Sequence, residues 1–115
     1  MTFRGEQRGY TMTLAQLGDA MYELIQPIEG PSSYEELLNG RGEGLNHLGY
    51  FVDDIDAAIR EMEEKGFPLI QSGRGMGVDG DGGYAYFETE NALGHIIEAI
   101  ELPGSLPDPE RTYPA

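Results

Sequence analysis

One short pattern occurs twice in the chain, and each copy places a glutamate among apolar residues. The first copy runs from Gly9-Tyr10 to the strand around Glu23, and the second runs from Gly83-Tyr84 to the strand around Glu98. A carboxylate among apolar neighbours is costly unless a partner compensates for its charge. Because this costly residue recurs at matching points of a repeat, the pattern indicates a shared ligand. A metal ion is the leading candidate.

Composition and charge limit the function classes. The chain has 115 residues, 17 Gly, no Cys and a net charge of −14. This length suits one compact domain, and the absence of Cys excludes disulfides and thiolate ligands. The negative charge disfavours nucleic acid and anionic membranes, and it favours cations. No apolar run approaches the ~18 residues of a membrane span, and the N-terminus lacks a signal-peptide core, so a cytoplasmic protein is expected.

Periodicity predicts an irregular α+β fold. Alternation predicts a hairpin of residues 10–17 and 20–26 that Pro27 ends, and a capping box at Ser32–Glu35 predicts a short helix through Leu38. The clearest helix begins at Asp53 or Asp54 and ends at Lys65-Gly66, with apolar residues at helical spacing. The remaining predicted strands are residues 45–52, 67–71, 84–88 and 94–101, with a Gly-rich loop over 73–83.

The predicted order of strands and helices gives one complete module and one incomplete module. Residues 45–103 form a complete βαβββ unit, whereas residues 9–30 match only the last two strands of another such unit. We therefore expect a single domain over residues 1–103 in which the first module is incomplete. Residues 104–115 are predicted to form an extended Pro-rich tail.

Period-2 alternation predicts that Glu23, His47 and Glu98 lie on otherwise apolar strand faces. If the three strands line one concave sheet, these side chains converge, with Gly49 leaving room beside His47. One imidazole and two carboxylates suit Zn, Mn, Co, Ni or Fe(II). Such a metal polarises a carbonyl while a carboxylate moves a proton, and Glu98 is the candidate catalytic residue.

Further residues near these strands are candidates for substrate binding or for other roles. Arg74, Tyr84 and Tyr86 are candidate substrate-binding residues, although core packing explains the tyrosines equally well. Asn46 is expected to point away from His47. The G-x-G-x-x-G run at residues 75–80 is followed by a strand, so it lacks the helix that a dinucleotide-binding loop requires.

The βαβββ unit, residues 47–58 and the ending Gly94-His95-Ile96-Ile97-Glu98 resemble the vicinal oxygen chelate superfamily. The resemblance covers residues 9–103 and is closest to the methylmalonyl-CoA epimerase and glyoxalase I types. It implies a curved mixed sheet around a divalent metal, with ligands from the first and last strands of each module. The incomplete first module implies that a fourth ligand and a second base are absent from this chain.

The resemblance implies a metal-dependent lyase, isomerase or epimerase that acts through an enolate or enediolate on a small carbonyl or thioester substrate. Two alternatives are a non-catalytic small-molecule binding protein of the antibiotic-sequestering kind and a ring-cleaving dioxygenase, which typically needs two His and one Glu. Three explanations for the incomplete module stay open: truncation, completion by a second chain, and a natural short form. A homodimer is expected, because a partner could cap the exposed sheet edge.

Overall fold

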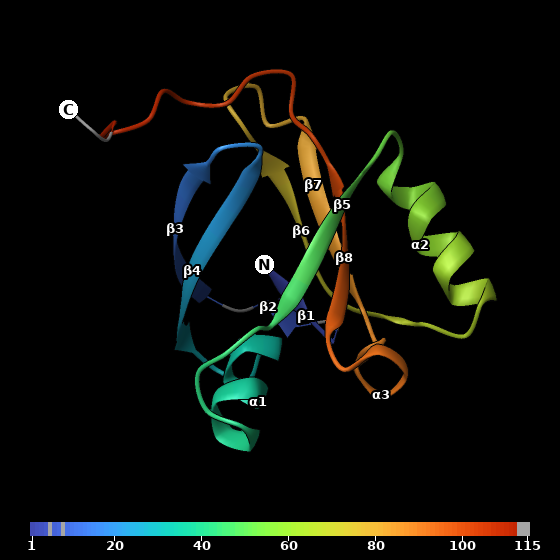
Figure 1. The fold of residues 1–115 in the computed structure, drawn as a ribbon. Coiled ribbons are helices and arrows are strands. Elements are labelled where there is room, and N and C mark those ends of the chain that lie inside the picture. Colours follow the sequence, from blue (N-terminus) through green and yellow to red (C-terminus); the bar gives the residue numbers. More distant parts are fainter. Residues whose placement is uncertain (5, 8, 113–115) are drawn as a thin grey trace.

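The computed structural model describes residues 1–4, 6–7 and 9–112 (Figure 1). Its elements in chain order are β1 (Thr2–Phe3), β2 (Glu6–Gln7), β3 (Gly9–Leu17), β4 (Ala20–Glu29), α1 (Ser33–Gly40), β5 (His47–Val52), α2 (Ile55–Glu64), β6 (Leu69–Met76), β7 (Gly82–Phe87), α3 (Glu90–Leu93) and β8 (Ile96–Glu101). None of the helices in this described part has the length and apolar character that a membrane crossing needs.

The strands form a large mixed sheet and a separate hairpin. The large sheet has the order β2-β1-β6-β7-β8-β5, in which the β5–β8 pairing is parallel and the other pairings of the described residues are antiparallel. The strands β3 and β4 pair with each other in a separate two-stranded sheet. Figure 1 shows the large sheet between the β3–β4 hairpin and α2. These features confirm the predicted α+β class. The division into one complete and one incomplete module stays a prediction.

The hairpin is longer than the alternation predicts. It turns at Gly18, whose φ is +62°, and β4 continues to Glu29 instead of ending at Pro27. The pairing register shifts between Gly9 and Tyr10, where Tyr10 lies opposite Pro27. Proline is tolerated in edge strands and at such irregularities because no ladder hydrogen bond from it is required.

Both predicted helices have the caps that the sequence indicates. The Ser32 hydroxyl accepts a hydrogen bond from the Glu35 amide at 3.2 Å, and Asp54 accepts from the two amides that follow Ile55. Such caps satisfy backbone donors that the first helical turn leaves unpaired. The side chains of Ile55 and Ala58 then attach α2 to the large sheet.

The predicted Gly-rich loop is mostly strand, because β6 runs to Met76 and β7 begins at Gly82. Gly73 shows why glycine is needed within β6: a Cβ atom there would lie 2.4 Å from Cε1 of Tyr84. The loop that remains between Met76 and Gly82 contacts the start of the C-terminal segment, because the Val78 amide donates a hydrogen bond to the Ser105 carbonyl at 2.9 Å. The strands β1 and β2, two residues each, were not predicted.

Two apolar clusters cover the two faces of the large sheet. The outer cluster joins α2 to the sheet and consists of Ile55, Ala58, Ala85, Phe87 and Ala99. The inner cluster consists of Tyr34, Ile70, Tyr84, Tyr86 and Ile96, and Tyr10 and Ile25 of the hairpin pack against it. The hairpin therefore rests on the inner face through side chains.

The hydroxyl of Thr89 joins β8 to the turn before it. It donates to the His95 carbonyl at 2.9 Å and accepts from the Ile97 amide at 2.9 Å, and the residue is 1% exposed. We expect Thr89→Val to lower the free energy of unfolding by about 1–3 kcal/mol, because two partly buried backbone groups lose their partner. Urea unfolding measures this change. Thr89→Ser keeps the hydroxyl and serves as the control; equal stability of the two variants would contradict the assignment.

Candidate metal centre

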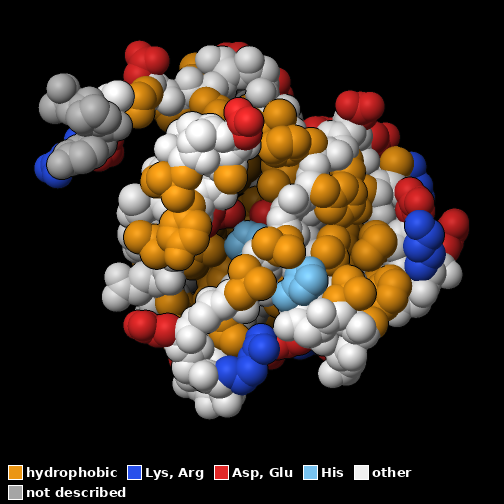
Figure 2. Space-filling view, viewed as in Figure 1, with side chains coloured by type: hydrophobic (Ala, Val, Ile, Leu, Met, Phe, Trp, Pro, Cys, Tyr) orange, Lys and Arg blue, Asp and Glu red, His pale blue; other side chains and the backbone are white. Residues whose placement is uncertain are grey.

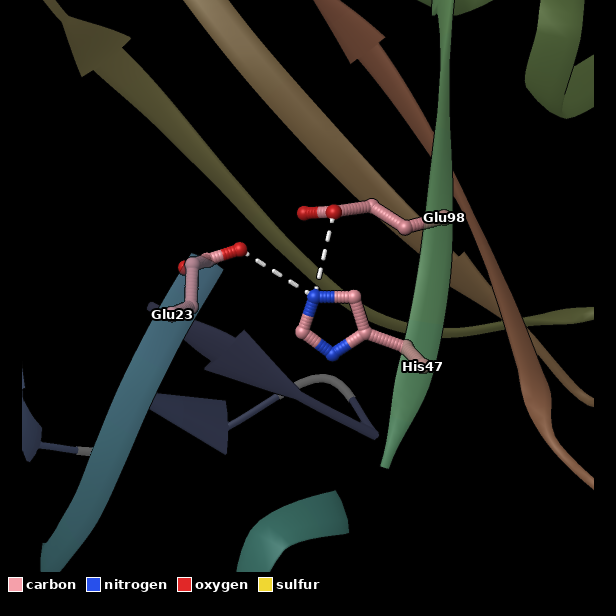
Figure 3. A group of neighbouring side chains, drawn as sticks. All are labelled: Glu23, His47 and Glu98. Carbon is pink, nitrogen blue, oxygen red and sulfur yellow. Dashed lines mark hydrogen bonds and ion pairs between the residues drawn. The ribbon is translucent and has the colours of Figure 1, made fainter. Parts of the chain in front are cut away.

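Glu23, His47 and Glu98 meet in one group, as the sequence predicts. They project from β4, β5 and β8 respectively (Figure 3). The Nε2 atom of His47 lies 3.2 Å from Oε1 of Glu23 and 3.2 Å from Oε1 of Glu98. One ligand atom from each residue lies within 4.8 Å of the other two. An imidazole nitrogen and two carboxylate oxygens thus face a common point.

Strand pairing places two of these residues. The parallel register of β5 and β8 sets Gly49 opposite Glu98, and His47 shares the face of Gly49 because it is two positions earlier. A Cβ atom at Gly49 would lie 2.9 Å from Oε1 of Glu98 and 2.6 Å from Cδ1 of Ile100. The glycine therefore leaves the space that the Glu98 carboxylate occupies.

The group lies in the floor of a hollow between the hairpin and β5. Figure 2 shows acidic and histidine side chains there, with apolar side chains on both rims. The side chains of His47 and Glu98 are 9% and 6% exposed, and that of Glu23 is 22% exposed. The three charged groups are therefore mostly removed from water, and Glu23 is the most exposed of them.

Burial and mutual contact shift the ionisation of these groups. Burial lowers the pKa of His47, but hydrogen bonds to Glu23 and Glu98 outweigh it and raise this pKa to about 9. Burial raises the pKa of Glu98, and the neighbouring His47 opposes the rise. At neutral pH and without a bound ion, His47 is therefore an imidazolium that lies between the two carboxylates.

The donor set fits a divalent transition metal. Ligand bonds of about 2.0–2.2 Å place neighbouring ligand atoms about 2.8–3.6 Å apart around an octahedral or tetrahedral ion. Both observed nitrogen–oxygen distances are 3.2 Å. These two distances lie within that range, and an ion could replace the proton of His47.

Asn46 orients the imidazole, which corrects the prediction that its side chain points away from His47. Its Oδ1 atom lies 3.0 Å from Nδ1 of His47, and its Nδ2 atom donates to the Ser33 carbonyl at 3.2 Å. A protonated Nδ1 leaves Nε2 for the ion, and such outer contacts commonly fix the ligand tautomer. Strand alternation could not reveal this contact, because Asn46 precedes β5 and is held by α1.

Aromatic residues surround the group on the inner face. The hydroxyl of Tyr86 lies 3.4 Å from Nε2 of His47, and the ring centroids are 4.6 Å apart. Tyr84 packs next to Tyr86, and its hydroxyl lies 3.5 Å from that of Tyr10. The predicted Tyr84 and Tyr86 are thus near the candidate metal ligands, although their role in substrate binding stays a prediction.

Arg74 lies elsewhere. Its Nη2 atom pairs with Oδ1 of Asp56 at 2.6 Å, and both side chains are more than half exposed. This surface pair joins β6 to α2 and does not contact His47. A role for Arg74 in substrate binding stays a prediction.

Comparison with known proteins identifies the family. The sequence model of the Glyoxalase/Bleomycin resistance protein/Dioxygenase superfamily matches residues 1–87. The chain belongs to this superfamily. Membership confirms the resemblance drawn from the residues around His47 and Glu98 and agrees with the mixed sheet that the structure shows.

Individual proteins and solved structures are similar to parts of this chain. Anthranilate synthase component 1 of Archaeoglobus fulgidus is 35% identical over 83 residues, which are 70% of this chain and 18% of that protein. A hypothetical protein of Bacillus halodurans C-125 has a TM-score of 0.66 and 24% identity, and the match covers 88% of this chain and 72% of that structure. Methylmalonyl-CoA epimerase of Mycobacterium tuberculosis has a TM-score of 0.63 and 24% identity, with coverages of 90% and 66%.

The ionisation of His47 makes the stability of the ion-free fold depend on pH. Folding raises the pKa of His47 from 6.5 to about 9, so its contribution is complete below pH 6.5 and is lost as the pH rises to about 9. We expect a loss of about 3 kcal/mol over this interval. Urea unfolding in the presence of a chelator measures it. His47→Gln should lack this decline, and parallel curves for the two proteins would refute the assignment.

Proposed function

We propose that the chain binds one divalent transition metal ion through Glu23, His47 and Glu98 and acts as a lyase, isomerase or epimerase. The observation that carries this proposal is the convergence of two carboxylates on one imidazole nitrogen, each at 3.2 Å, in a largely buried site. Superfamily membership and the epimerase among the structural neighbours support it. The metal would be Zn, Co, Ni, Mn or Fe.

The bound ion would polarise the carbonyl of the substrate and so acidify the adjacent C–H group. Glu98 is the residue we propose to move the proton, because it is 5% exposed and burial raises its pKa. It would take the proton from carbon, leaving an enolate or enediolate of the substrate, and return it to the neighbouring carbon, whereas epimerisation would need a proton donor on the opposite face. Asn46 would hold the His47 ring in place throughout.

The substrate class that fits is a small carbonyl compound or thioester with a removable α-proton. The hollow has apolar rims, which suit the non-reacting part of such a molecule (Figure 2). The net charge of −14 favours the less anionic members of this class. We assign no individual substrate.

A homodimer is part of the proposal. The edge strand β5 carries apolar side chains on both faces, with Leu48 51% exposed and Phe51 67% exposed. Natural edge strands usually carry charged side chains such as Lys, or proline, as protection against pairing, and β5 contains no Lys, Arg, Asp, Glu or Pro. A second copy could cover this edge in the cytoplasm, where we place the protein.

A second candidate function is small-molecule binding without chemistry. The apolar rims of the hollow favour it, because they would hold a ligand even where no proton is moved. Ring cleavage by a dioxygenase is the third possibility, and it has less support because the converging group holds a single His. Measurements of metal content and of proton exchange distinguish the proposed catalysis from these two alternatives.

We expect purified chain to retain about one divalent ion when it is dialysed against cobalt or zinc and then against buffer. His47→Ala should retain less than about a tenth of this amount, because the ion loses the ligand that both carboxylates face. Elemental analysis measures the content. His95→Ala, which removes the other histidine, is the matched control. An ion-free wild type, or a His47→Ala variant with full content, would refute the metal site.

Proton exchange tests the reaction. In D2O, the metal-loaded chain should incorporate deuterium next to the carbonyl of a substrate drawn from methylmalonyl-CoA and the hemithioacetals of 2-oxoaldehydes, as followed by NMR. Glu98→Gln should slow the exchange by about 10²–10⁴-fold, the usual contribution of a general base. The exposed Glu88→Gln is the control. Undiminished exchange in Glu98→Gln would exclude Glu98 as the base.

A further inference from the structure

The phenol groups of Tyr34 and Tyr86 share one hydrogen bond beside the candidate metal centre. Their oxygens are 2.9 Å apart, and the two residues are 5% and 1% exposed. Tyr34 comes from the first turn of α1, whereas Tyr86 lies in β7 directly opposite Glu98 of β8. The pair therefore connects a helix to the same row of the sheet that carries the buried carboxylate.

Counting the hydroxyl protons shows which of the two phenols faces the site. Two hydroxyls that share one hydrogen bond have one proton between them and one proton left over. Among the described residues, Tyr34 has no hydrogen-bond partner other than Tyr86, whereas the Tyr86 hydroxyl also lies 3.4 Å from Nε2 of His47. An unpaired buried hydroxyl proton is costly, so the favoured arrangement has Tyr34 donating to Tyr86. The remaining proton is then on Tyr86, whose hydroxyl borders His47 in the site.

His47 cannot accept this proton in either state of the site. Nε2 carries a proton in the imidazolium, and it would bind the ion in the metal-loaded protein that the proposed function requires, so it offers no free lone pair. Tyr86 is buried, so its proton needs another acceptor within the hollow. The oxygen of a small molecule that enters the hollow can provide this acceptor.

We propose that Tyr86 is the hydrogen-bond donor to a substrate oxygen in this site, and that Tyr34 is the residue that positions its hydroxyl. The proposal rests on the proposed function, since it needs an ion on His47. It assigns the site a ligand class: molecules with an electron-rich oxygen, such as a carbonyl or enolate oxygen. The Tyr10 and Tyr84 hydroxyls, 3.5 Å apart, form a separate contact and are not part of this donor pair.

The test uses cobalt-loaded protein and acetohydroxamate, an oxygen-donor chelator whose binding changes the visible absorption of cobalt. Tyr86→Phe should keep the cobalt content of the wild type but bind acetohydroxamate about tenfold more weakly, the effect of one lost hydrogen bond. Tyr34→Phe should weaken binding about threefold. Tyr22→Phe, which removes an exposed hydroxyl on β4, should leave binding unchanged.

A double variant separates positioning from packing. Because Tyr34 acts through Tyr86, Tyr34→Phe should add no further loss when Tyr86 is already Phe. Wild-type affinity in Tyr86→Phe at full cobalt content, or additive losses in the double variant, would overturn the corresponding assignment. A wild type that takes up no cobalt would instead refute the proposed function, and this inference with it.

Discussion

Glu98 is a carboxylate on the buried face of an apolar strand, and it can stay ionised there only with a positive charge beside it. The positive charge is the imidazolium of His47, which is shared with Glu23. Gly49 leaves the space for the carboxylate, and Asn46 holds the imidazole from its far side. A metal cation would fulfil the same electrostatic requirement as the proton, so one arrangement serves both states of the site.

The two faces of the large sheet carry different kinds of side chains. On the outer face, α2 packs against Ala85, Phe87 and Ala99, each of which is 0% exposed. The inner face carries the charged group and the hydroxyls, which contribute less to apolar packing. The outer face therefore packs through apolar side chains, whereas the inner face combines an apolar cluster with polar groups that need partners when buried.

The candidate ligands were predictable from the sequence because each depends on local alternation within a strand. The positions of Glu23, His47 and Glu98 follow from period 2 and from the repeat. Asn46 and Tyr34 were not recognised, because their contacts depend on where α1 packs against the sheet. The extents of β6 and β7 were also missed: Gly73 admits the ring of Tyr84, whereas composition alone indicates a loop. Nonlocal packing decides these features, and a single sequence does not encode it in a short pattern.

The hairpin and the large sheet both contribute residues to the candidate metal centre. Over the described residues, β3 and β4 share no strand pairing with the large sheet, and the hairpin contacts it through side chains such as Tyr10 and Ile25. Glu23 belongs to the hairpin, and the other two ligands belong to the large sheet (Figure 3). An ion held by all three residues would therefore link the hairpin to the large sheet, two parts that share no backbone pairing. In the ion-free protein the His47 imidazolium makes the same connection, so the hairpin stays attached to the large sheet whether or not an ion is bound.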